Sequence, residues 1–168
     1  MTFAVLCGGV AALIALVSGG VTFGAGYAEA TSLLQDHPGR ALGFALSKFG
    51  ATLAASASGV PGGIFAPSLA TGAGLGAAAF ARLGLAVGGR DAVVLGMTSY
   101  LTGVVQAPLT SAVILMEMTR QPGLVGPLLL AALLARWASG LIMLEPIYHF
   151  LAANWRLTPI SGERKSAL

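Results

Sequence analysis

Residues 62–67, Gly-Gly-Ile-Phe-Ala-Pro, are the part of this sequence whose residue types could hold a ligand. They lie where a loop rich in glycine and proline, residues 58–63, meets a long apolar stretch that we expect to be helical. Gly62 and Gly63 have no side chains that would keep a ligand away from the backbone. Pro67 fits the first turn of a helix, because a missing N–H costs nothing there.

The chemistry of such a helix start is anion binding. The first N–H groups of the helix, near Ile64 and Phe65, have no acceptor within the helix and carry about half a positive charge from the helix dipole. They can attract an anion without the full charge of Lys or Arg, so the anion can leave again, as permeation requires. Glycine pairs before helices are common, and from the residues alone this pattern also fits an ordinary helix start.

Composition places this helix start in a membrane. Charged residues make up 9% of the chain, against about 25% in a typical soluble domain, and the mean hydropathy is +0.85. Residues 1–28, 49–81 and 92–116 contain no charge, and about 20 apolar residues suffice to cross a bilayer. We therefore predict an integral, multi-pass membrane protein.

The nine basic residues mostly separate the apolar stretches, as loop and interface residues do. They form no basic patch with interleaved aromatics, so we expect no nucleic-acid partner. The single Cys7 excludes an internal disulfide. Residues 1–20 could be a signal peptide, but they lack a basic start, and a membrane helix is favoured.

The elements that must position the residues 62–67 are all expected to be helices, in an all-α polytopic membrane fold with broken and short helices. Expected helices are residues 3–18, 27–35, 41–57 (apolar apart from Lys48), 64–85, 92–105, 109–118, 124–144 (with Arg136 inside it, snorkelling or paired with an acid) and a final short helix over 145–153. Loops are expected at 88–91 and 120–123. Residues 1–153 form the membrane domain and 154–168 a polar tail.

Several of these segments are shorter than one bilayer crossing, and their breaks fall at membrane depth. Backbone groups at depth need partners, so such breaks are tolerated only against protein or a water-filled cavity, as in secondary transporters. Small residues recur four apart at Gly72/Gly76 and Ala73/Ala77. This spacing predicts close packing between membrane helices.

Three motifs occur in a fixed order: residues 62–67, then Ala-Pro-Leu-Thr at 107–110 with Met-Glu-Met-Thr at 116–119, then Pro-Ile-Tyr at 146–148. In this order they resemble the CLC family of chloride channels and proton/chloride antiporters. The resemblance covers essentially the whole chain, as the C-terminal half of the family's membrane domain, which is one half of an inverted repeat.

The resemblance implies roles for single residues. Ile64 and Phe65 match the residues whose backbone amides bind the central chloride, with Gly62, Gly63 and Pro67 supporting the loop. Tyr148 matches a tyrosine whose hydroxyl faces the same ion, and a phenol is a neutral, directional donor. Without the resemblance, Tyr148 is better read as an interfacial aromatic.

The resemblance also implies chloride transport across the plasma (inner) membrane, with no enzymatic activity, no metal and no cofactor. It implies a homodimer with one pore per subunit, whose interface includes residues 109–118 and 124–141.

The motifs of the family's other half do not occur: neither a Gly-Ser-Gly-type loop nor a Gly-Glu-Gly-Pro-type loop with the gating glutamate. The candidate acids have other neighbours; they are Glu29, Glu117, Glu145 and Glu163. We therefore expect this chain to be a truncated or split protein that needs the missing N-terminal half. Channel and antiporter are not separated, because the residues that decide between them belong to that half.

Three alternatives stay open. One is a different broken-helix secondary transporter. Another is an intramembrane serine protease with Ser58 as nucleophile and His149 as base, although Ser56 stands where a glycine would be expected. The last is a membrane fragment of the same ancestry with a structural role only.

Overall fold

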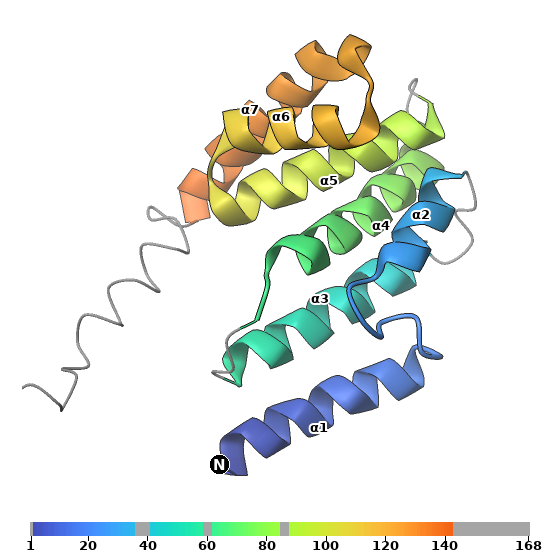
Figure 1. The fold of residues 1–168 in the computed structure, drawn as a ribbon, viewed down its shortest axis with the longest axis vertical. Helices are drawn as coiled ribbons and strands as arrows, with labels where there is room; N and C mark the ends of the chain where they lie inside the picture. The colour runs from blue at the N-terminus through green and yellow to red at the C-terminus, as the bar shows by residue number, and fades with distance from the viewer. Residues whose placement is uncertain (1, 36–40, 59–61, 85–87, 143–168) are drawn as a thin grey trace, which may run out of the picture.

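The computed structural model describes residues 2–35, 41–58, 62–84 and 88–142 (Figure 1). Within these ranges the chain is all-α and contains no strand, as the sequence predicts. The elements, in order, are α1 (Thr2–Val17), α2 (Tyr27–Leu34), α3 (Ala41–Ala57), α4 (Phe65–Leu83), α5 (Gly89–Val105), α6 (Pro108–Thr119), the 3-10 turn η1 (Pro122–Leu124) and α7 (Val125–Ile142).

The helices form a layer in which neighbours in the chain are mostly neighbours in space (Figure 1). Helices α1, α3, α4 and α5 follow one another across it, α2 lies over α4 and α5, and α6 and α7 close the far end. Consecutive long helices run in opposite directions. The start of α4 therefore lies at the same end of the layer as the ends of α3 and α5.

The closest approach in the layer is between α4 and α5, and glycines make it possible. A Cβ added at Gly72 would lie 2.7 Å from the carbonyl oxygen of Gly96, and one added at Gly96 would lie 2.5 Å from the carbonyl oxygen of Gly72. Gly76 likewise faces the backbone of Ala92 and Gly96. The small-residue spacing read from the sequence thus does pack one membrane helix against another.

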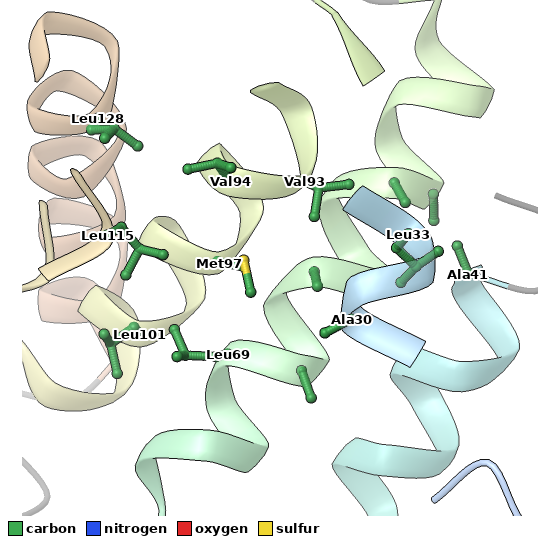
Figure 2. Packing of buried hydrophobic residues seen from close by; sticks show 14 of the residues in the cluster. Ala30, Leu33, Ala41, Leu69, Val93, Val94, Met97, Leu101, Leu115 and Leu128 are labelled. Atoms are coloured by element: carbon green, nitrogen blue, oxygen red, sulfur yellow. The ribbon is translucent and has the colours of Figure 1, made fainter. Parts of the chain in front are cut away.

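Many of the buried hydrophobic residues are alanines, and together with larger side chains they form one cluster that lies between the helices. Figure 2 shows Leu69 of α4 beside Leu101 of α5, with Leu115 of α6 and Leu128 of α7 on the other side of α5. Leu101, Leu115 and Leu128 are at most 2% exposed. Helix α5 is therefore the central element that joins the first helices to the last ones.

Outside this packing, large apolar side chains are exposed at both ends of the layer, on α1 and α7: Val5, Leu6, Val10, Leu13, Leu16, Leu130, Leu133, Leu134, Trp137 and Leu141. Exposed large apolar side chains gathered on one helix suit contact with lipid or with further membrane helices. Pro122–Ile142 is the one described helical stretch long and apolar enough to cross a membrane by itself. Shorter apolar helices are Ala4–Val17, Ala41–Ala57 and Pro108–Thr119, as the sequence predicts.

The loop expected at residues 88–91 is wrong. Helix α5 already begins at Gly89, with Gly88 as an extended N-cap (φ −62°, ψ 147°) whose carbonyl accepts the N–H of Ala92 at 3.0 Å. Asp91 lies in the first turn, where a carboxylate is favoured by the positive end of the helix dipole. The carboxylate of Asp91 is thus a signal of a helix start, and the loop prediction did not take it into account.

The loop expected at residues 120–123 is also partly wrong, because Pro122 and Gly123 belong to η1. The segment from Pro122 to Val125 turns the chain from α6 into α7, and Arg120 ends α6 in the left-handed conformation (φ 51°, ψ 39°).

We expect Arg120→Gly to stabilise the protein by about 0.5–1 kcal/mol, because a non-glycine residue is strained at positive φ. The Arg120 side chain is exposed, so its removal should cost little. The measurement is the melting temperature in detergent, which should rise. The control is Arg120→Ala, which removes the same side chain and keeps the strain. An equal gain in both variants would assign the effect to the side chain and contradict the backbone explanation.

Candidate anion site

The start of α4 has the features that the sequence predicts for an anion site. Helix α4 begins at Phe65, and no side chain caps it at Ile64 (φ −85°, ψ −23°). The first turn contains no acidic residue. Its leading N–H groups therefore point out of the helix without a carboxylate competing for them.

Space is open around this helix start. Gly62 and Gly63 are exposed, and nothing lies within 4 Å of where a Cβ of Gly63 would be. Phe65 is 38% exposed, and Ile64 is half-buried. A small anion could thus reach the backbone amides without displacing a side chain.

Pro67 lies in the first turn of α4, where its missing N–H leaves no helical hydrogen bond unmade. The carbonyl oxygen of Ile64 accepts the N–H of Ser68 at 3.1 Å, which is the first hydrogen bond of the helix. The carbonyl oxygen of Pro67 accepts the buried hydroxyl of Thr71 at 2.9 Å. The backbone carbonyls at the helix start are thus hydrogen-bonded within α4.

Tyr148, the other chloride ligand expected from the sequence, lies outside the described residues. So do the final short helix, His149 and the polar tail over 154–168. Of the site residues expected from the sequence, the structure therefore describes those at the start of α4: Gly62, Gly63, Ile64, Phe65 and Pro67.

A second break in the layer, between α5 and α6, is held by polar groups of α7. Gln106 ends α5 in the left-handed conformation (φ 57°) and is 8% exposed. The Nη1 of Arg136 donates to the carbonyl oxygen of Gln106, and the Oγ of Ser139 donates to that of Gly103 at 2.7 Å. The Nε2 of Gln106 in turn donates to the Oγ of Ser139 at 3.4 Å. These carbonyls belong to the last turn of α5, and in an apolar setting such helix-end carbonyls need protein donors.

Arg136 was expected to snorkel or to pair with an acid; its side chain is exposed, and its guanidinium binds the backbone carbonyl of Gln106. The sequence contained a usable signal: a Gln-Ala-Pro break at 106–108 leaves helix-end carbonyls that a nearby cation can satisfy. What the sequence did not contain was the pairing of that break with α7.

A third break, between α1 and α2, is held in a similar way by Lys48 of α3. Its Nζ donates to the carbonyl oxygens of Thr22 at 3.0 Å and Gly24 at 2.5 Å, and the side chain is 3% exposed. The connector over residues 18–26 has four left-handed glycines: Gly19, Gly20, Gly24 and Gly26. Sequence reasoning named Lys48 only as an exception in an apolar helix.

Short apolar helices whose breaks are closed by protein donors are typical of polytopic α-helical membrane proteins. Residues 1–140 match the family model described as voltage gated chloride channel. The chain belongs to that family.

The curated relatives agree with the family match. The chain is 32% identical over 139 residues to the voltage-gated ClC-type chloride channel ClcB of Salmonella typhimurium, covering 79% of this chain and 33% of that protein. It is 33% identical over 134 residues to ClcB of Escherichia coli O81, covering 76% and 32%. It is 38% identical over 114 residues to the H(+)/Cl(-) exchange transporter ClcA of Citrobacter koseri, covering 61% and 23%. No solved structure matches the chain.

The match therefore spans about a third of the length of the ClcB relatives. Family membership and an integral membrane setting follow from these findings, as the sequence motifs predicted.

Proposed function

We propose that this chain forms part of a chloride transport pathway, as a channel or a proton/chloride antiporter, and that it is not an enzyme. The observation that carries the proposal is the start of α4. Its amides at Ile64 and Phe65 follow two exposed glycines and meet neither a side-chain cap nor an acidic residue. A half-charge of this kind holds an anion weakly enough to release it.

The hydroxyl of Tyr148 is the second proposed ligand. Its position after Pro-Ile at 146–148 matches the family motif, and a phenol donates a hydrogen bond without adding charge. Amides on one side and a hydroxyl on the other would replace part of the water around chloride.

We propose that the complete transporter contains a further membrane portion; in support, the chain spans only about a third of the ClcB proteins that it resembles. We propose that this portion is the N-terminal half with the gating glutamate, on the same polypeptide or a separate one. Two such units would form a homodimer in the plasma (inner) membrane, with α6 and α7 in the interface. Exposed Leu109, Val113 and Leu130 on these helices support such a contact.

The test is chloride binding by the complete transporter in detergent, measured by calorimetry and by thermal stabilisation with chloride against gluconate. Ile64→Pro removes one amide donor next to the permissive Gly63. We expect chloride affinity to fall by about tenfold or more, since a hydrogen bond to an ion is worth about 1.5–3 kcal/mol.

The matched control is Ile64→Val, which keeps the amide and should bind normally. Tyr148→Phe should also weaken binding. Stabilisation by gluconate equal to that by chloride would favour a different broken-helix transporter, and labelling of Ser58 by a fluorophosphonate would favour an intramembrane protease.

A further inference from the structure

Lys48 is a basic side chain buried inside the layer of helices. It lies near the middle of α3, it is 3% exposed, and its two described hydrogen bonds go to neutral carbonyl oxygens of the α1–α2 connector. Among the described residues no carboxylate lies within ion-pair distance of it. The ammonium is thus bound by dipoles, and its charge is not cancelled by direct contact with an acid.

The position of Lys48 relative to the anion site follows from the packing of Gly26. A Cβ built on Gly26 would lie 2.8 Å from the Cβ of Ala70 on α4 and 3.3 Å from the Cε of Lys48. The Lys48 side chain therefore lies against the second turn of α4. Ala70 follows Phe65 by five positions, or about 8 Å along a helix, so the ammonium lies about 10–15 Å from the amides at the start of α4.

We propose that Lys48 is a fixed positive charge that raises the anion affinity of the α4 start without touching the anion. The inference rests on the proposed chloride site. Buried charges are little screened by salt, and at this range a unit charge in a protein interior changes anion affinity by roughly three- to tenfold. The same side chain donates hydrogen bonds to the carbonyls of Thr22 and Gly24, so it also holds the α1–α2 connector in place.

Within the described ranges, one acidic group opposes this charge. Glu29, in the first turn of α2, interacts electrostatically with Lys48 from beyond ion-pair distance. Glu29 is only partly buried, so its effect on an anion is smaller and of opposite sign.

The experiment uses the complete transporter and measures dissociation constants for chloride and bromide by calorimetry. Lys48→Gln keeps a donor for the connector and removes the charge; we expect both constants to rise by the same factor, about three- to tenfold. Lys48→Arg keeps the charge, and it should stay within about twofold of the original protein. Glu29→Gln should bind both anions about twofold more tightly.

The outcomes separate charge from structure. A general loosening of the fold could weaken binding in Lys48→Gln, but it would not tighten binding in Glu29→Gln. Unchanged affinity in Lys48→Gln overturns the inference and leaves the chloride site standing. If Lys48→Gln does not fold, Glu29→Gln decides, and equal or weaker binding there overturns the inference. Absence of chloride binding in the original protein overturns the site and the inference together.

Discussion

Replacing Gly96 with alanine is expected to abolish stable folding of the chain, at a cost of about 3 kcal/mol, near the upper end of the overpacking penalties measured in cores. One methyl group at this position would lie 2.5 Å from the carbonyl oxygen of Gly72 and 2.6 Å from the Cα of Gly76. Both contacts are backbone atoms of α4 and cannot rotate away. The measurement is the monodisperse fraction in size-exclusion chromatography in detergent, together with the melting temperature.

Gly103→Ala is the matched control, because Gly103 lies on the same helix and nothing lies within 4 Å of its added Cβ. Alanine has the higher helix propensity, so this variant should be as stable as the original protein or slightly more so. Equal behaviour of the two variants would show that α4 and α5 do not approach each other as described.

Replacing Arg136 with methionine is expected to destabilise the protein by about 2 kcal/mol. The change keeps an unbranched side chain of similar length, but the carbonyl of Gln106 loses its hydrogen bond from the charged guanidinium. A hydrogen bond from a charged donor is worth about 1.5–3 kcal/mol. Thermal melting in detergent measures the effect.

The control for this prediction is Arg82→Met, which removes a basic residue from the exposed last turn of α4. A surface change of that kind stays within about 0.5 kcal/mol. A similar loss in both variants would indicate that net charge matters and that the contact with Gln106 does not.

Much of the fold was predictable because hydrophobic segments and breakers are local properties. Helix α3 is found at 41–57 as predicted, and α4 at 65–83 lies within the expected 64–85. The errors fell at 88–91 and 120–123, where glycine and proline suggested loops but helix starts and a 3-10 turn were formed. Helix ends depend on caps and on single backbone conformations, which composition does not determine.

The candidate site was predictable at Ile64 and Phe65, because a glycine pair and a helix start are adjacent in the chain. The roles of Lys48 and Arg136 were not, because their partners at Thr22 and Gln106 are 26 and 30 residues away. A residue's contact with a distant carbonyl depends on which helices become neighbours. That information is contained in the packing of α3 and α7, and in no local pattern.

The order of helices across the layer has a consequence for how the protein is made. Each of α1, α3, α4 and α5 packs mainly on helices close to it in sequence. Contacts between near neighbours form fast, since little chain must be closed into a loop to make them. The helices of the layer can therefore pack in the order of synthesis, with each new helix packing against helices that are already in place. The α4–α5 contact becomes available once residue 105 has left the ribosome and entered the bilayer.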